Sequence, residues 1–228
     1  MTDDTLHRRS LISAVGVAAA AIALRSGTAE AQPPPAAGFK PARHPQDAWL
    51  DGLPGKHRTI IDSFSVNGGG EALLFANNLH VANTAGYGLS DAEVAVVVTL
   101  RHKSTQFAFN NAMWAKYGKG LSEGLDLVDP KTKQAPTVNL FNTPGYGPEL
   151  PNFGLTIDSV AKIGVHFAIC QMATRRLAGQ IAKAVGGTSD AIYDDLVANT
   201  VPNGHMVAAG VIAVTRAQEY GYTVLVAG

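Results

Sequence analysis

The only cysteine of the chain, Cys170, follows an apolar run over 163–169, and a helix-competent run begins directly after it at Gln171. This layout predicts a thiol at the carboxyl end of a buried strand, beside the positive end of a helix. Such a position can lower the pKa of a cysteine from ~8.5 to ~3.5–7.5, which gives a nucleophilic thiolate at neutral pH. The alternative is a small, inert residue that ends the strand, because free cysteine is among the most buried residue types.

Two further groups of residues could bind an anionic ligand near this thiol. The first group follows the first predicted strand and consists of Asn67, Gly68, Gly69 and Gly70. Backbone N–H groups of a glycine turn that opens a helix can hold an anion, although a tight turn also needs glycine without any ligand. The second group, Arg101 and His102, follows the second predicted strand. Neither a P-loop lysine nor a G-x-G-x-x-G pattern is present, so no nucleotide cofactor is expected.

Histidines could supply a base for the thiol. His166 lies four residues before Cys170 and shares its strand face, where a hydrogen-bonded core histidine is the commoner role. We expect His80 and His205 to be structural or solvated. No metal site is expected, since a lone cysteine with scattered histidines fixes no coordination geometry. A Cys-His hydrolase would need an oriented third partner and an oxyanion site, which the sequence does not reveal.

Strand and helix patterns alternate after residue 57 and must position these residues. The predicted strands cover 59–66, 93–100, 164–169, 204–208 and 222–226. The predicted helices cover 70–84, 104–117, 156–163, 172–185, 189–198 and 211–220. The run Val94–Val98 is apolar throughout, which is typical of a parallel strand covered on both faces. Five strands separated by helices predict an α/β fold with a doubly wound, mostly parallel five-stranded sheet, a flavodoxin-like three-layer sandwich.

A strand order predicts where a ligand would bind. In the flavodoxin-like order 2-1-3-4-5, the connections change direction between the first and third strands, and ligands bind at the carboxyl ends of these strands. The first strand leads into Asn67 and the third ends at Cys170. The glycine-rich turn and the thiol would then face each other across one crevice.

The first 31 residues have the features of an export signal. The pair Arg8-Arg9 precedes an apolar stretch over 11–24 and a small-x-small cleavage pattern at 29–31, and the stretch is too short to span a bilayer comfortably. The paired arginines resemble the signal of the twin-arginine (Tat) route, and ordinary secretion and an uncleaved anchor are the alternatives. We expect a periplasmic or secreted mature protein that begins near Gln32 and has no stable membrane anchor.

The mature chain is organised as a tether followed by one domain. Residues 32–56 are rich in proline and poor in apolar residues, which predicts an extended tether or a strap over the domain. Residues 57–228 are predicted to form a single domain. Within it, a long insertion at about 103–152 ends in a stretch rich in glycine, proline and asparagine. A structureless stretch of this length indicates a lid, a subunit contact or disorder.

The charge balance excludes two classes of partner. The chain has 18 basic and 18 acidic residues, and the predicted signal removes three of each kind. A near-neutral mature chain without a basic run offers no electrostatic basis for binding nucleic acid or an anionic membrane. We therefore expect a small molecule or a protein as partner.

Several short motifs occur in the carboxyl-terminal half and near the first strand. They lie at 164–170, 199–201, 206–207 and 217–224, with Ala72, Leu74, Asn77 and Asn78 in the front part. These motifs are similar to the DsrE/DsrF-like family of sulfur-relay proteins, and the resemblance covers roughly 57–228. It implies a DsrE/F-like fold, assembly into homo-oligomers (trimers or hexamers), and a persulfide carried on Cys170. The export signal and the long insertion depart from the family pattern.

Two functions follow from these observations. The leading expectation is an exported DsrE-like persulfide carrier, or a sulfurtransferase-like relay, that uses Cys170 between sulfur donor and acceptor proteins. The alternative is a non-enzymatic periplasmic ligand-binding or oligomeric assembly module with a buried, inert cysteine. In that case the insertion would be a ligand lid or a subunit interface.

Overall fold

The computed structural model describes residue 38 and residues 40–228, and the compact unit considered below runs from Arg43 to Gly228. The predicted export signal lies outside the described residues. In the part of the chain that is described, no helix combines the length and the apolar character needed to cross a membrane.

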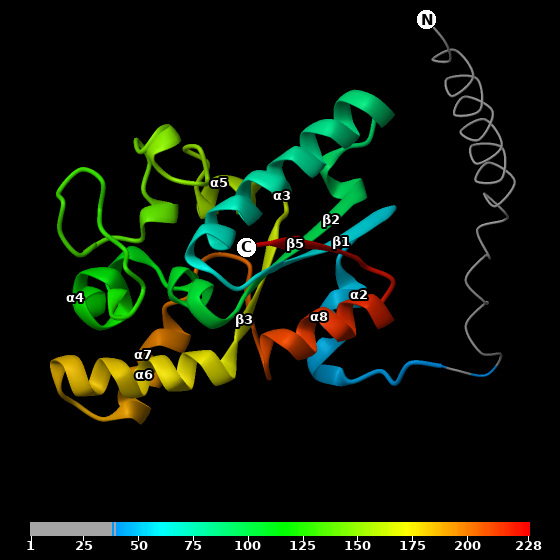
Figure 1. Cartoon of the computed structure of the whole chain (residues 1–228). Helices are drawn as coiled ribbons and strands as arrows, with labels where there is room; N and C mark the ends of the chain where they lie inside the picture. The colour runs from blue at the N-terminus through cyan, green and yellow to red at the C-terminus, as the bar shows by residue number, and fades with distance from the viewer. Residues whose placement is uncertain (1–37, 39) are drawn as a thin grey trace, which may run out of the picture. The chain divides into compact units, whose positions relative to one another are not determined.

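The core of the unit is a five-stranded sheet (Figure 1). Its strands are β1 (His57–Ser63), β2 (Val94–Leu100), β3 (His166–Cys170), β4 (Gly204–Val207) and β5 (Thr223–Ala227). All neighbouring strands pair in parallel. The predicted fold class, an α/β protein with a doubly wound five-stranded sheet, is confirmed.

The order of the strands is β4-β3-β2-β1-β5, so the order 2-1-3-4-5 is wrong. β2 lies between β1 and β3, as the pairs Ser63↔Leu100 and Leu100↔Ile169 show. Every residue of β2 is buried, whereas most of β5 is exposed or half-buried. A largely apolar strand is most stable with neighbours on both sides and helices on both faces, which places β2 inside the sheet and β5 at its edge.

Helices cover both faces of the sheet. The larger core lies under α3 (Val66–Tyr87), α4 (Asn111–Ser122), α5 (Ile157–Lys162), α6 (Gln171–Val185) and α7 (Ser189–Ala198). The smaller core lies under α8 (Gly210–Glu219) and α2 (Ala48–Gly52). In Figure 1, α3 and α8 lie on opposite sides of β1 and β5. Consecutive strand residues such as Ile60 and Ile61 therefore enter different cores.

The long insertion packs into the larger core, so the alternative of disorder is wrong, whereas a lid or a subunit contact stays a prediction. It contains three 3-10 helices, η3 (His102–Ala108), η4 (Leu140–Asn142) and η5 (Gly147–Glu149), and α4 between the first two. Asn110 caps α4 by accepting from the Met113 N–H, which interrupts the helix predicted over 104–117. Asn139 donates to the carbonyls of Phe107 and Phe109, both at 2.9 Å. These bonds tie the later part of the insertion to its first part, which follows β2.

Part of the proline-rich segment belongs to the same compact unit. We call residues 43–53, which include η1 (Pro45–Asp47) and α2, the strap. Leu50 is buried in the smaller core, and its carbonyl accepts from the Tyr222 hydroxyl at 2.8 Å. The Trp49 ring stacks on the His205 ring with 4.0 Å between centroids. The strap therefore covers the α8 face of the sheet.

Candidate functional site

The direction of the connections changes between β3 and β4. The helix after β3, α6, packs in the larger core, whereas the helix after β4, α8, packs in the smaller core on the opposite face. In open α/β sheets, ligands bind outside the carboxyl ends of strands at such a point. A cavity of about 320 Å³ lies there. It is lined by Arg101, His102, Cys170, Met172, Ala173, Arg176, Ala209, Gly210 and Val211. We call it the Cys170 cavity.

Cys170 joins β3 to α6. It is the last residue of the strand and the N-cap of the helix, where its Sγ accepts from the Ala173 N–H at 3.4 Å. The Thr174 hydroxyl donates to the Cys170 carbonyl at 2.9 Å and fixes the turn. The residue is 7% exposed, and it lines the cavity. The thiol thus lies at the strand-to-helix junction that the sequence indicated, and the partial positive charge of the helix end favours an anion beside it.

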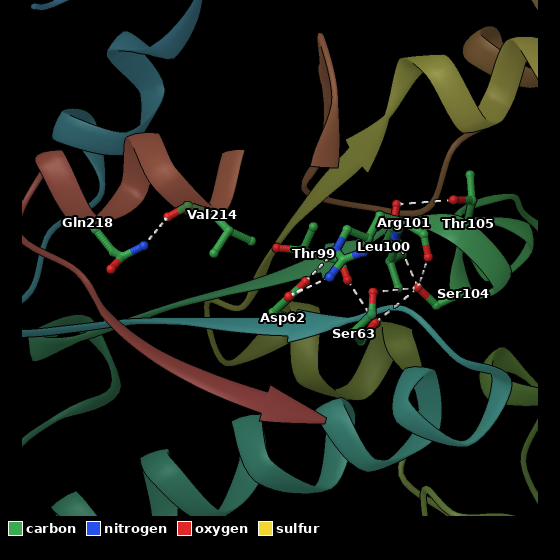
Figure 2. Close-up of polar contacts among 9 residues, drawn as sticks. All are labelled: Asp62, Ser63, Thr99, Leu100, Arg101, Ser104, Thr105, Val214 and Gln218. Carbon is green, nitrogen blue, oxygen red and sulfur yellow. Dashed lines mark hydrogen bonds and ion pairs between the residues drawn. The ribbon is translucent and has the colours of Figure 1, made fainter. Parts of the chain in front are cut away.

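Arg101 is fixed by a two-point ion pair. Its Nε and Nη2 donate to Oδ1 and Oδ2 of Asp62, both at 2.7 Å (Figure 2). The two side chains are 23% and 13% exposed, so the pair is largely withdrawn from water. The hydrogen bond to Asp62 is the main cause that raises the pKa of Arg101, and the Asp62 charge and Cys170 also raise it against the effect of desolvation.

The backbone of Arg101 is fixed by a serine network. The Ser104 hydroxyl accepts from the Arg101 N–H at 3.0 Å and lies 2.9 Å from the Ser63 carbonyl (Figure 2). The Ser63 hydroxyl donates to the Thr99 carbonyl at 2.7 Å. Both serines are fully buried. These bonds join the carboxyl ends of β1 and β2 to the turn that carries Arg101.

Gly210 allows α8 to approach Arg101 closely. A Cβ at this position would overlap Cβ of Arg101 and lie 2.9 Å from its Cδ. The N-cap of α8, Ala209, has no side chain that caps the helix. The first N–H groups of α8 therefore begin at the wall of the cavity, next to the stem of Arg101.

The rim of the Cys170 cavity is apolar and basic. Met172 is 69% exposed and Val211 is 55% exposed. Among the described residues that line the cavity, none is an aspartate or a glutamate, and the charged ones are Arg101 and Arg176. An anion with an apolar neighbouring group would meet compatible surfaces here.

The structure brings together three of the predicted site residues: Cys170, Arg101 and His102. The predicted glycine turn does not share this cavity. Asn67, Gly68, Gly69 and Gly70 lie in the first turn of α3, which Ser65 caps by accepting from the Gly68 N–H at 2.8 Å. A Cβ on Gly68 would overlap the Ala227 carbonyl oxygen. The expectation that the turn faces Cys170 is therefore wrong, because β2 separates β1 from β3, and ligand binding by these four residues stays a prediction.

Asn67 lines a different cavity, of about 500 Å³, together with Lys103, Asp126 and Glu149. Acidic and basic side chains are mixed there, so the charge of this cavity favours no single class of ligand. The three glycines beside Asn67 are buried against neighbouring elements. Close packing alone is sufficient to explain why these three positions are glycine.

Apart from His102, the histidines discussed for the sequence lie away from the Cys170 cavity. His166 begins β3, and its Nδ1 lies 2.9 Å from Nε2 of His205. Desolvation lowers the pKa of both rings. His166 is thus hydrogen-bonded, as predicted, but it is half-buried and not in the core, and it lies at the opposite end of β3 from Cys170. His80 is buried, with its Nδ1 3.1 Å from Oδ1 of Asp91. Within the described residues, no three histidine, cysteine or carboxylate side chains are placed to hold a metal ion.

Sequence reasoning missed most of the other residues around Arg101 and Cys170, and two of these, Asp62 and Gly210, contact Arg101. Asp62 interrupts an apolar strand, and a carboxylate in that position needs a buried partner. This signal was available, although only the strand order identifies Arg101 as the partner. Gly210 is one of many glycines in the sequence. No pattern in the neighbouring residues indicated that it contacts the site.

Comparison of the chain with protein-family models, with curated proteins and with solved structures found no match. The site is therefore defined by its own geometry: a thiol at a strand-to-helix junction, a fixed arginine and the uncapped start of a second helix around one cavity.

Proposed function

We propose that this chain is an exported DsrE-like carrier of sulfane sulfur, in which Cys170 accepts a sulfur atom as a persulfide and passes it to a partner protein. The observation that carries the proposal is the position of the only cysteine at the carboxyl end of β3, in a cavity whose charged lining residues are arginines. The resemblance to sulfur-relay proteins in the motif around Cys170 supports the same chemistry.

The first half-reaction loads Cys170. The Cys170 thiolate attacks the outer sulfur of a donor such as thiosulfate, a sulfur–sulfur bond forms to Cys170, and the donor's own sulfur–sulfur bond breaks. Sulfite leaves with the electron pair of that bond, and the product is the Cys170 persulfide anion. In the second half-reaction a thiolate of the acceptor attacks the terminal sulfur, and Cys170 leaves as a thiolate. No external oxidant or reductant is consumed.

The residues around the sulfur suit both steps. The Ala173 N–H donates to Sγ at 3.4 Å, and the start of α6 favours negative charge at this point. Arg101 supplies a positive charge in the same cavity. Met172 and Val211 add apolar side chains to the lining of the same cavity.

Intact mass spectrometry of the mature protein tests the proposal. After incubation with thiosulfate or polysulfide, the wild-type chain should gain the mass of one sulfur atom, and a thiol reductant should remove it. Cys170→Ser should gain nothing. A wild-type chain that forms no such adduct with either donor would overturn the proposal.

A non-enzymatic binding or assembly module is the second candidate, and the low exposure of Cys170 favours it. In that case Cys170 should resist alkylation until denaturant is added, because an inert buried thiol is inaccessible in the folded state. The trimeric or hexameric assembly implied by the resemblance suits either candidate. Leu225 and Val226, 41% and 62% exposed on the edge strand β5, offer apolar surface for it. Light scattering of the purified mature protein measures the oligomeric state.

A further inference from the structure

We propose that Arg101, positioned by Asp62 and Gly210, makes the Cys170 cavity selective for small anionic reactants over neutral ones of the same size. Arg101 is the specificity-determining residue in this inference, and Asp62 is the positioning residue. The description of these reactants as sulfur donors rests on the proposed function. The selectivity itself is a property of the cavity and can be measured without any sulfur transfer.

The first support is that Arg101 is held from several sides. Asp62 fixes the guanidinium at two points, and Ser104 fixes the backbone of Arg101. The guanidinium carbon also lies 5.1 Å from the centre of the Phe64 ring. A long side chain loses much conformational freedom in such a setting. This cost is offset by the ion pair, and the result is a charge in a defined position.

The second support is the set of donors that remains available. An arginine carries five N–H donors, and Asp62 accepts from Nε and from one hydrogen of Nη2. Among the described residues, no acceptor forms a hydrogen bond with Nη1. Arg101 lines the Cys170 cavity and Asp62 does not. The unused Nη1 donors therefore remain for a reactant in this cavity.

The third support is the close contact between Arg101 and α8. Gly210 leaves room for the stem of Arg101, which a Cβ would displace. The N–H groups of Gly210 and Val211 begin a helix that no side chain caps, and both residues line the cavity. The partial positive charge of this helix end adds to that of Arg101 at the same wall.

Alkylation of Cys170 by a matched pair of reagents tests the inference. Iodoacetate is anionic and iodoacetamide is neutral, and both attack the same sulfur, so the ratio of their rates is independent of the fraction of thiolate. Because the chain has one cysteine, the reaction reports on Cys170 alone. The ratio for the folded protein, divided by the ratio for the urea-unfolded protein, measures the selectivity of the cavity.

We expect the folded wild-type protein to favour iodoacetate, and Arg101→Gln to lower the ratio about tenfold, the size of a lost charge-assisted hydrogen bond. Arg101→Lys should restore part of the ratio. Arg175→Gln is the matched control and should leave the ratio unchanged, because Arg175 stacks on Tyr193 and does not line the cavity.

The Asp62→Asn variant distinguishes the effect of the position of Arg101 from the effect of the net charge of the site. The variant makes the site more positive, so a pure charge effect would raise the ratio, whereas loss of a fixed Arg101 would lower it several-fold. A raised ratio would overturn the role of Asp62, and an unchanged ratio in Arg101→Gln would overturn the selectivity. Absence of alkylation by either reagent in the folded state would also overturn it. If Asp62→Asn fails to fold, the alkylation ratios of Arg101→Gln and Arg101→Lys still test the selectivity.

The same variants distinguish this inference from the proposed function. A chain that shows the expected selectivity but never gains sulfur would contradict the carrier function and leave the selectivity standing. A chain that gains sulfur equally well with Arg101→Gln, at an unchanged alkylation ratio, would contradict the inference and leave the carrier function standing.

Discussion

Arg101 donates from Nε and Nη2 to the two carboxylate oxygens of Asp62, both at 2.7 Å, and so links the carboxyl ends of β1 and β2 on the α8 face. Asp62 lies in the strand register beside Thr99, two residues before Arg101.

Removal of Asp62 should destabilise the domain strongly. Asp62→Ala leaves a largely buried guanidinium without its partner, which costs about 3 kcal/mol in comparable pairs. Urea unfolding measures the change. Lys56→Ala is the control, because its ion pair with Glu93 is exposed and such pairs contribute about 0–1 kcal/mol. Equal effects of the two substitutions would contradict a structural role for the Asp62–Arg101 pair.

Gly210→Ala should lower stability by about 1–3 kcal/mol, because the added Cβ overlaps the stem of Arg101. The alkylation ratio of Cys170 should fall in parallel as Arg101 moves. Gly179→Ala in α6 is the matched control, since its Cβ would meet only Ser189 Oγ at 3.8 Å. That substitution should be neutral or stabilise the helix by up to about 1 kcal/mol. A Gly210 variant as stable and as selective as the wild type would count against the close contact.

Gly68→Ala should also destabilise, by about 1–3 kcal/mol or more, because the new Cβ meets the backbone carbonyl of Ala227, which has little room to move. Gly86→Ala lies in the same helix with open space around it and should be neutral or slightly stabilising. The melting temperatures of both variants show whether the glycines after β1 are needed for close packing. A Gly68 variant that is fully stable, yet loses binding of an added anion, would favour the ligand-binding role instead.

Stability should fall as the pH drops below neutrality. Desolvation lowers the folded-state pKa of His166 and His205, while the unfolded rings titrate near ~6.5. Below that pH the unfolded chain binds more protons than the folded one, so the stability present above ~6.5 is lost as the pH falls toward the folded pKa values. Melting temperatures between about pH 8 and about pH 5 measure this loss.

The double variant His166→Gln, His205→Gln is the control for this pH dependence. Its melting temperature should vary less over the same range, because the two rings whose pKa is lowered are absent. The pKa values of Asp129 and Asp195 are also lowered. These carboxylates make stability depend on pH only below their ordinary pKa of 3.8, outside the range measured here. An unchanged slope in the double variant would assign the pH dependence to other groups.

Leu50→Ala should destabilise the whole domain by about 2–5 kcal/mol, because Leu50 is fully buried in the smaller core. Val185→Ala, at a side chain that is 47% exposed, is the control and should change stability little. Urea unfolding with a single transition for Leu50→Ala would show that the strap unfolds together with the sheet. A loss confined to the first residues, detected by limited proteolysis without a change in global stability, would show the strap to be an independent tether.

The sequence was most informative where local patterns decide the outcome. The apolar run before Cys170 and the polar run after it predicted a strand-to-helix junction, and the structure places Cys170 there as the N-cap of α6. The helix predicted over 189–198 agrees with α7, since Thr188 offers a local cap to the Ala191 N–H. Periodicity and capping depend on neighbours in the chain, so they can be read without knowing the fold.

Predictions that depend on contacts between residues far apart in the chain were less accurate. The strand order determines that Arg101 meets Asp62 and that Asn67 and Cys170 lie apart, and this order depends on which strand is buried on both sides. The insertion likewise looked structureless because its hydrogen bonds join residues far apart, such as Asn139 and Phe107.

The sequence by itself determined the alternation of strands and helices, the five-stranded parallel sheet, and the position of Cys170 at the end of a strand. Only the tertiary structure decided that β2 lies between β1 and β3, that the strap packs on the α8 face, and that Arg101 is held between Asp62 and Gly210. The physical reason is that hydrophobic periodicity is local, whereas the competition among strands for buried positions involves the whole chain.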